Sequence, residues 1–201
     1  YSGNEGEEKA QKTYNYNFAG NQIKTVTSFT YTNDALTLSV TNKVANITGD
    51  TTDVTLGAKK SETIYQGNEG EEKAQKTYNY DFAGLAVKTT TTFTYTNDAL
   101  TSSVTVKGQD GAVKKSETTY LGNEGEEKAQ KTYNYNFDGD QIKTVTEFFY
   151  INDALTSSNT NKVLPGAATI AQVTVGSMKS ITEYSGNEGE EKAQKTYNYN
   201  F

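Results

Sequence analysis

Carboxylates and lysines carry nearly all the acid–base chemistry of this sequence, because it contains no histidine, cysteine or arginine. A Ser-His-Asp set, a Cys-His pair and a His/Cys metal cluster are therefore excluded. A carboxylate pair remains, and Glu5, Glu7 and Glu8 recur with their copies along the chain. A catalytic dyad needs one pair tuned by its environment, which a repeated charged loop does not provide. We therefore predict no enzyme activity and no catalytic residue.

The loop that carries these glutamates also suggests a calcium site. Ca²⁺ prefers six to eight oxygen ligands, including carboxylates and loop carbonyls. Asn4, Glu5, Glu7 and Glu8 could supply several of them. The favoured alternative is a solvated charged turn whose glutamates are balanced by nearby lysines, so we expect no metal and no cofactor.

Two further patterns admit a chemical interpretation. A Thr-x-Thr triplet recurs at 25–27, 89–91 and 144–146, and such a pattern can order water on a flat sheet. Ordinary strand propensity on a polar face explains it more simply. Lysine, asparagine and carboxylates also allow Lys–Asn isopeptide bonds, which require a buried pair that sequence does not reveal.

The composition narrows the class of protein. The net charge is −6 and the pI is near 4.8, which argues against a nucleic-acid partner. No apolar run is long enough to span a membrane, so no membrane insertion is expected. The absence of cysteine excludes a disulfide scaffold. Because the chain opens with Tyr1, we expect a mature product or a fragment.

An internal repeat dominates the sequence. The segment 3–18 returns at 67–82 with one change and at 122–137 and 186–201 without change. The copies start 64, 55 and 64 residues apart (67 − 3, 122 − 67 and 186 − 122). We therefore divide the chain into repeat units 1–66, 67–121 and 122–185 and the start of a further unit at 186–201.

The last copy extends further back, since 184–201 reproduces 1–18 residue for residue. One interpretation is a three-repeat domain that ends in a capping copy. The other is a window on a longer array, which we favour because capping repeats normally diverge from the consensus.

Each unit is predicted to form four strands. The first, Lys9–Phe18, alternates aromatic and polar residues, and the second is predicted at Ile23–Thr32. Turn residues Asn33-Asp34 precede a third strand, which begins at Leu36, and a fourth ends at Tyr65. The last two strands are joined by Gly108–Gly111 in the short unit and by longer loops around 49–50 and 165–166. The predicted fold is all-β: a repetitive antiparallel β-meander of about thirteen strands, forming an elongated solenoid- or spiral-like array.

Aromatic residues recur at fixed positions in the first two strands of each unit. Because aromatic side chains bury a large area each, we expect them to stack as a structural ladder that holds the repeats in register. The ladder comprises Tyr14, Tyr16, Phe18, Phe29, Tyr31, Tyr78, Tyr80, Phe82, Phe93, Tyr95, Tyr133, Tyr135, Phe137, Tyr197, Tyr199 and Phe201.

The segments 14–20 and 78–84, Tyr-Asn-Tyr-Asn-Phe-Ala-Gly and Tyr-Asn-Tyr-Asp-Phe-Ala-Gly, resemble the Tyr-x-Tyr-Asp-x-x-Gly core of tyrosine–aspartate (YD, or RHS-type) repeats. The resemblance covers the first two strands of each unit. It implies long β-strips on secreted or cell-surface bacterial proteins. This chain departs from that pattern by lacking arginine and by its much longer units.

Two functions are expected from these observations. The first is an extracellular or cell-surface structural repeat protein that forms a fibre, stalk or surface layer and self-associates into a filament. The alternative is an adhesin-type binding module for glycans or another surface. Burial of the Tyr14, Tyr16 and Phe18 copies would weigh against the alternative.

Overall fold

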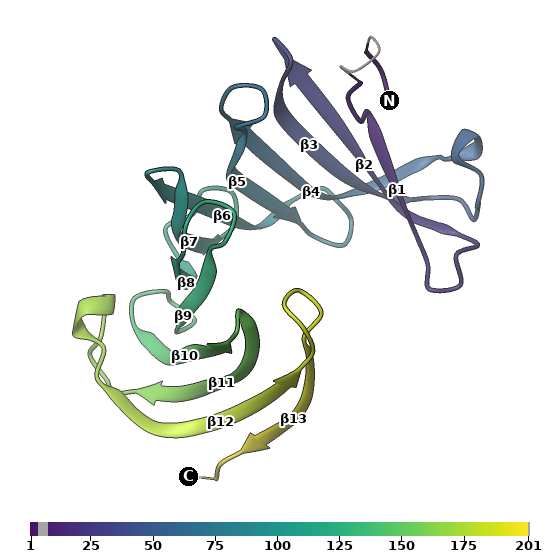
Figure 1. Cartoon of the computed structure of the whole chain (residues 1–201). Coiled ribbons are helices and arrows are strands. Elements are labelled where there is room, and N and C mark those ends of the chain that lie inside the picture. Colours follow the sequence, from purple (N-terminus) through teal and green to yellow (C-terminus); the bar gives the residue numbers. More distant parts are fainter. Residues whose placement is uncertain (4–7, 201) are drawn as a thin grey trace. The chain divides into compact units, whose positions relative to one another are not determined.

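The computed structural model describes residues 1–3 and 8–200. Within these residues, thirteen strands follow one another in chain order in a single antiparallel meander, with β1 and β13 at its two edges (Figure 1). The predicted all-β meander is therefore confirmed. The strands are β1 (Lys12–Tyr16), β2 (Ile23–Thr32), β3 (Ala35–Val44), β4 (Leu56–Gln66), β5 (Lys73–Tyr80), β6 (Val87–Thr96), β7 (Ala99–Lys107), β8 (Lys114–Leu121), β9 (Lys128–Tyr135), β10 (Ile142–Ile151), β11 (Ala154–Val163), β12 (Val175–Ser185) and β13 (Lys192–Asn198).

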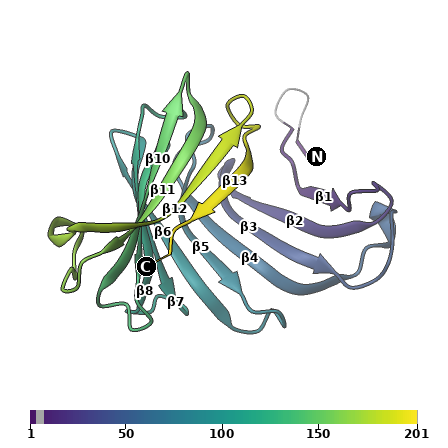
Figure 2. The ribbon, with the colours of Figure 1, turned by 90° about the horizontal axis from the view of Figure 1, so that it is seen from below.

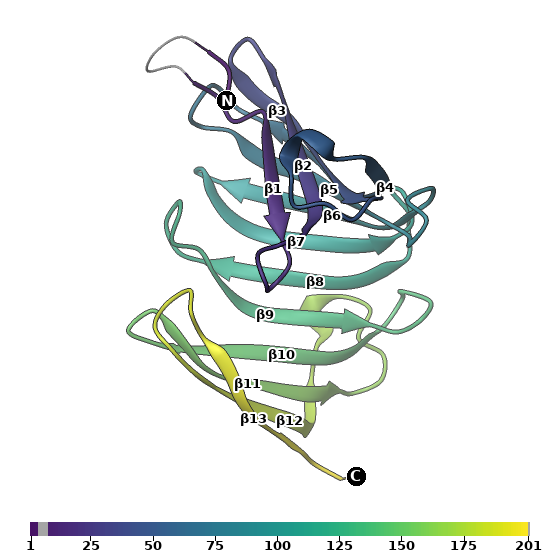
Figure 3. The same ribbon diagram turned by 90° about the vertical axis from the view of Figure 1, so that its right-hand side faces the viewer.

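The chain divides into two compact units. Unit 1 comprises Tyr1–Thr92 with Gly108–Asp110, and unit 2 comprises Phe93–Lys107 with the chain from Gly111 onward. Strands β2 to β5 run side by side in unit 1 (Figure 2), and β8 to β11 do so in unit 2 (Figure 3). Only two short 3₁₀ turns, η1 (Thr51–Asp53) and η2 (Ile170–Gln172), interrupt the strands of the described residues. Neither is long and apolar enough to cross a membrane.

The hairpin turns between the second and third strands follow directly from their sequence. Asn33 and Asp34 have φ angles of 48° and 67°, and the copies at Asn97-Asp98 and Asn152-Asp153 repeat these values. Two consecutive residues with positive φ match the right-handed twist of paired strands, and among residues other than glycine, Asn and Asp tolerate this conformation best. Local chemistry therefore places these turns where the sequence predicted them.

The first strand is shorter than predicted. It ends at Tyr16 rather than Phe18, because the Asn17 carbonyl accepts the Gly20 N–H and the Asn17 N–H donates to the Gln22 carbonyl. These two bonds close a turn that contains Phe18. The phenylalanine and its copies Phe82 and Phe137 are consequently exposed, which corrects the expectation that alternation continues to this position.

One face of the sheet carries threonine pairs, and we call it the threonine face. Paired residues of neighbouring strands lie on the same face, and successive residues alternate between faces. Thr27 lies opposite Thr41 and their hydroxyl oxygens are 2.8 Å apart. Four equivalent pairs have separations of 2.9–3.0 Å: Thr63–Thr77, Thr118–Thr132, Thr146–Thr160 and Thr182–Thr196.

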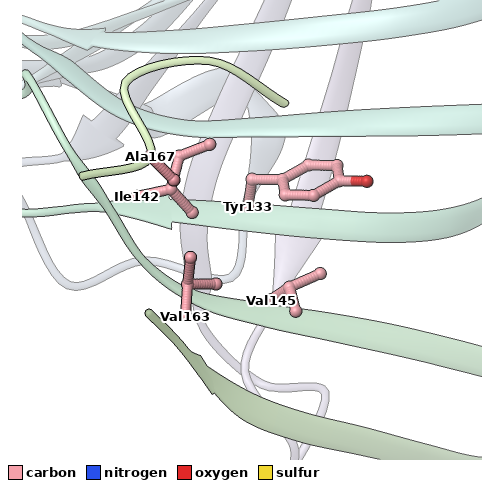
Figure 4. Close-up of a cluster of buried hydrophobic side chains, with 5 residues drawn as sticks. All are labelled: Tyr133, Ile142, Val145, Val163 and Ala167. Carbon is pink, nitrogen blue, oxygen red and sulfur yellow. The ribbon is translucent and has the colours of Figure 1, made fainter. Parts of the chain in front are cut away.

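The opposite face, which we call the tyrosine face, holds the few fully buried side chains. In unit 2 the connection between β11 and β12 folds over the start of β10, and the Ile142 N–H donates to the Ala167 carbonyl. Ala167 lies beside Ile142, and the two form one buried cluster with Tyr133, Val145 and Val163 (Figure 4). In unit 1 the β3–β4 loop acts similarly, since the Ile23 N–H donates to the Thr48 carbonyl. Each long hairpin loop thus bonds to the start of the strand beneath it, and the β11–β12 loop also contributes to a buried hydrophobic cluster.

The short β7–β8 hairpin loop also contacts the strand beneath it, but through hydrogen bonds to a threonine side chain. Thr90 occupies the position of Val26 and Val145 and is 1% exposed. Its hydroxyl donates to the Gly108 carbonyl at 2.7 Å and accepts the Asp110 N–H at 3.1 Å. A shorter loop brings backbone polar groups to this position, and threonine satisfies them where valine would not.

Candidate functional site: the repeat junction

The Gly-Asn-Glu-Gly-Glu-Glu loop is the element that joins one repeat to the repeat before it. We call its copies at residues 67–72, 122–127 and 186–191 the acidic loops. Gly67 adopts a φ of +136°, and a Cβ at this position would lie 2.4 Å from the Glu71 carbonyl oxygen. Glycine is therefore required for a loop tight enough to direct its glutamates at the preceding repeat.

The third glutamate of each acidic loop binds the backbone of the preceding repeat. Glu72 Oε1 accepts the N–H of Leu36 at 2.8 Å, and its Oε2 accepts the N–H of Gly70 at 3.0 Å. The pairing of β3 with β4 extends only to Leu38, so it does not use the Leu36 N–H. Glu127 and Glu191 bind the N–H groups of Leu100 and Leu155 in the same way.

These backbone donors change the acidity of the glutamates. The Leu36 N–H, together with the N–H of Glu72 itself, lowers the pKa of Glu72 below its usual value. The Leu155 N–H lowers the pKa of Glu191 in the same manner. A donor that stabilises the charged carboxylate has this effect. The glutamates are therefore ionised at neutral pH.

The first glutamate of the acidic loop binds a lysine of the preceding repeat. Lys9 Nζ lies 2.8 Å from Glu69 and 2.9 Å from Asp34. Burial acts to lower the pKa of Lys9, but the hydrogen bonds to Glu69 and Asp34 outweigh it and raise the pKa. In unit 2, Lys128 bridges Asp153 and Glu188 at 2.6 and 3.1 Å.

A third contact is made by the turn that follows the first strand of a repeat. Lys43 Nζ donates to the Phe82 carbonyl at 2.9 Å and lies 3.5 Å from the centre of the Phe82 ring. Lys107 makes the same pair of contacts with Phe137. Gly84, in the same turn as Phe82, approaches so closely that a Cβ would lie 2.5 Å from the Lys59 nitrogen. Lys43 and Lys107 are half-buried, and a cation–π contact of this kind contributes modestly, so the close backbone fit is what positions this turn.

A cleft recurs beside the bridging lysine. In unit 2 it has a volume of about 750 Å³ and includes Lys128, Gln130, Phe148 and Tyr150 in its lining. The unit 1 cleft, of about 450 Å³, is lined at equivalent positions by Lys9, Gln11, Phe29, Tyr31 and Asp34. Such a cleft combines aromatic rings with an amide and charged groups.

The sixteen aromatic residues expected to form a ladder are distributed over both faces. The Tyr14 position lies opposite Val26 on the tyrosine face, whereas Phe29 lies opposite Ser39 on the threonine face. Tyr78 and Tyr133 are buried, and Tyr14, Phe29, Tyr31, Tyr80, Phe93, Tyr95 and Tyr135 are half-buried. The exposed members are Tyr16, Phe18, Phe82, Phe137, Tyr197 and Tyr199, and Phe201 lies outside the described residues.

The calcium hypothesis falls largely outside the described residues, since Asn4, Glu5 and Glu7 belong to the segment 4–7. Glu8 is described and engaged in an interaction. In a described copy of the loop, Glu69 binds an ammonium group and Glu72 binds backbone N–H groups. Within residues 1–3 and 8–200, no three acidic side chains are grouped so as to hold a metal ion.

Comparison with known proteins does not assign this chain to a family. No protein-family model matches this chain, and no curated protein matches it.

Two features of the structure are visible in the sequence only in retrospect. The five threonine pairs that define the threonine face are each 14 residues apart, a separation much shorter than the repeat unit and easily overlooked beside it. Glu72 and Leu36 are separated by 36 residues, and nothing in a local pattern connects them.

Proposed function

We propose that this chain is an extracellular or cell-surface structural repeat protein without catalysis. Its repeats form part of an elongated, solenoid- or spiral-like β-array of the kind that YD repeats build, used as a fibre, stalk or surface layer. One observation carries the proposal: each described acidic loop binds the preceding repeat through the same glutamate-to-backbone contact. A contact repeated at every junction supports a function that depends on repetition.

Self-association belongs to this proposal. Strands β1 and β13 form the edges of the meander, and an edge strand offers unpaired backbone groups to another chain. We propose that copies associate end to end into a filament.

Electron microscopy of the native material tests the proposal. An axial period attributable to the 55- and 64-residue units supports it. Discrete monodisperse particles at every concentration examined contradict it.

The second candidate is an adhesin-type module that binds glycans, and the recurring cleft favours it. Half-buried Phe29 and Phe148 stand beside Gln11 and Gln130, so each cleft offers an aromatic surface and an amide to a sugar ring. Binding on a glycan array that is lost in a Phe29→Ala/Phe148→Ala variant supports this candidate. A wild-type chain that binds no glycan contradicts it.

A further inference from the structure

Lysines gather at the edge of the sheet opposite the acidic loops. In an antiparallel meander all connections from odd to even strands lie at one edge, and those from even to odd strands lie at the other. The acidic loops are even-to-odd connections. Lys24 is the second residue of β2 and Lys43 the second-to-last of β3, so both lie at the odd-to-even edge. Lys60, the fifth of the 11 residues of β4, lies in the half of its strand nearer that edge.

These three lysines line one cleft in unit 1. The cleft has a volume of about 380 Å³, and the rest of its lining is neutral: Gln22, Ile23, Thr25, Val44, Ala45, Asn46 and Ile47. The nearest loop carboxylates in the sequence, Asp50 and Asp53, do not line it, and Asp50 accepts the Thr52 N–H instead.

The register of the strands brings the lysines together. Lys43 lies opposite Thr25, the residue after Lys24, and Thr41 lies opposite Ser61, the residue after Lys60. The three lysines belong to the adjacent strands β2, β3 and β4. Neighbouring strands are about 4.8 Å apart, so the backbone positions of the lysines are close together. Lys24 and Lys60 are exposed, whereas Lys43 is half-buried and contacts Phe82.

The three lysine positions recur in the amino-acid sequence of every repeat. Its copies are Lys88, Lys107 and Lys115 in the second repeat and Lys143, Lys162 and Lys179 in the third. In unit 2 the register is also preserved, with Lys162 opposite Thr144 and Thr160 opposite Ser180. Nine of the 19 basic residues of an acidic chain thus occupy three equivalent positions.

We propose that these lysine sets bind an acidic polysaccharide, a saccharide chain bearing sulfate or carboxylate groups. Repeated cationic clusters suit a ligand whose anionic groups also repeat, because several weak contacts then act together. Lysine binds such groups as a point charge, and the absence of arginine leaves no bidentate contacts for nucleic-acid phosphates. The choice of a surface polymer rests on the location proposed above, whereas the anion site rests on the lysines alone.

Binding of dextran sulfate, with unmodified dextran as the neutral probe, tests the inference. We expect the wild-type chain to bind dextran sulfate and not dextran, with an affinity that falls as salt rises. Lys24→Gln/Lys60→Gln is expected to weaken binding at least about fivefold, since one lysine near an anionic surface contributes about that factor. Both lysines are exposed, and Lys24→Arg/Lys60→Arg should retain binding because it keeps the charge.

The matched control is Lys12→Gln/Lys195→Gln, which removes the same charge from exposed positions in β1 and β13. It should bind within about twofold of the wild type, because it leaves every lysine set intact. Equal loss in both glutamine variants, or no binding of dextran sulfate, overturns the inference. Binding only to nucleic acid or to vesicles rich in phosphatidylserine also overturns it. None of these outcomes affects the axial period that tests the structural proposal.

Discussion

Glu72 joins two repeats with a single side chain. Its carboxylate accepts N–H groups from Leu36 in one repeat and from Gly70 in its own loop. A charged acceptor gives stronger hydrogen bonds than a neutral one, and a donor left without its partner is costly. The repeat junction therefore depends on the charge of this residue.

We expect Glu72→Gln to lower the free energy of unfolding by roughly 1 kcal/mol, because the amide accepts these bonds less strongly. Urea unfolding measures the change. The control is Glu71→Gln, an exposed neighbour in the same loop, which should have little effect. Equal destabilisation by the two variants would contradict the role assigned to Glu72.

The pKa of Glu72 adds a pH dependence with a definite sign. Because the folded state lowers the pKa, the unfolded chain binds more protons in acid. The stabilisation by Glu72 is present above the pKa of the unfolded chain and is lost as pH falls through the lower, folded pKa. The difference in stability between wild type and Glu72→Gln should therefore shrink on acidification.

Lys59 and Glu62 form a pair that a later repeat replaces by apolar residues. Lys59 Nζ lies 2.6 Å from Glu62 Oε2, and the third repeat has Met178 and Ile181 at these positions. Lys59 is paired with Asn42 in the sheet, just as Met178 is paired with Asn161. The two positions thus change together within one chain.

We expect Lys59→Met or Glu62→Ile alone to cost about 1 kcal/mol, since each leaves one partly buried charge without its partner. The double variant should return to within about 0.5 kcal/mol of wild type. A double-mutant cycle in urea measures the coupling. Strictly additive losses would show that the two side chains act independently.

At the scale of the element, the hairpin loop and the strand beneath it are matched. The long β3–β4 loop accepts the Ile23 N–H, and the long β11–β12 loop places Ala167 in a buried cluster with Ile142 and Val145. The short β7–β8 loop instead bonds to the Thr90 hydroxyl. Beneath the β11–β12 loop the apolar contact excludes water. In the short loop, the hydroxyl of Thr90 instead forms hydrogen bonds with the backbone polar groups.

Thr90→Val should therefore destabilise the chain by about 2 kcal/mol, because it leaves the Gly108 carbonyl and the Asp110 N–H without their partner. The change is measured by urea unfolding and by faster amide exchange at Asp110. Thr92→Val, on the exposed part of the same strand, is the control. An unchanged exchange rate at Asp110 would refute the matching of loop and strand.

At the scale of the whole molecule, identical sequences occupy different positions in the meander. Strand β9 (Lys128–Tyr135) lies between β8 and β10, whereas β13 (Lys192–Asn198) repeats its sequence at an edge and every residue of it is exposed. Intrinsic amide exchange rates depend on local sequence, which is the same in β9 and β13. A difference between the exchange rates of the two strands therefore reflects their positions in the sheet.

We expect the amides of Lys192–Asn198 to exchange at least about tenfold faster than those of Lys128–Asn134 in dilute solution, since edge strands open more readily. Hydrogen exchange measured by mass spectrometry tests this. End-to-end association would protect β13 as the protein concentration rises. Equal protection at all concentrations would contradict the assigned edge position.

The sequence by itself determined those features that depend on neighbours along the chain. Asn33-Asp34 predicts a tight turn, and alternation over 23–32 predicts a strand with the bounds that β2 has. The internal repeat also shows which positions are equivalent, so a strand or turn predicted in one repeat is predicted in the other repeats as well. These features are local because turn conformation and side-chain alternation are properties of a few consecutive residues.

The tertiary structure decided which residues meet across the sheet. Phe18 continues an alternating pattern, yet two backbone hydrogen bonds place it in an exposed turn. The contact of Glu72 with Leu36 and the grouping of Lys24, Lys43 and Lys60 depend on the register of the strands. Register sets the partner of every residue, and it results from the pairing of whole strands, which no short segment encodes.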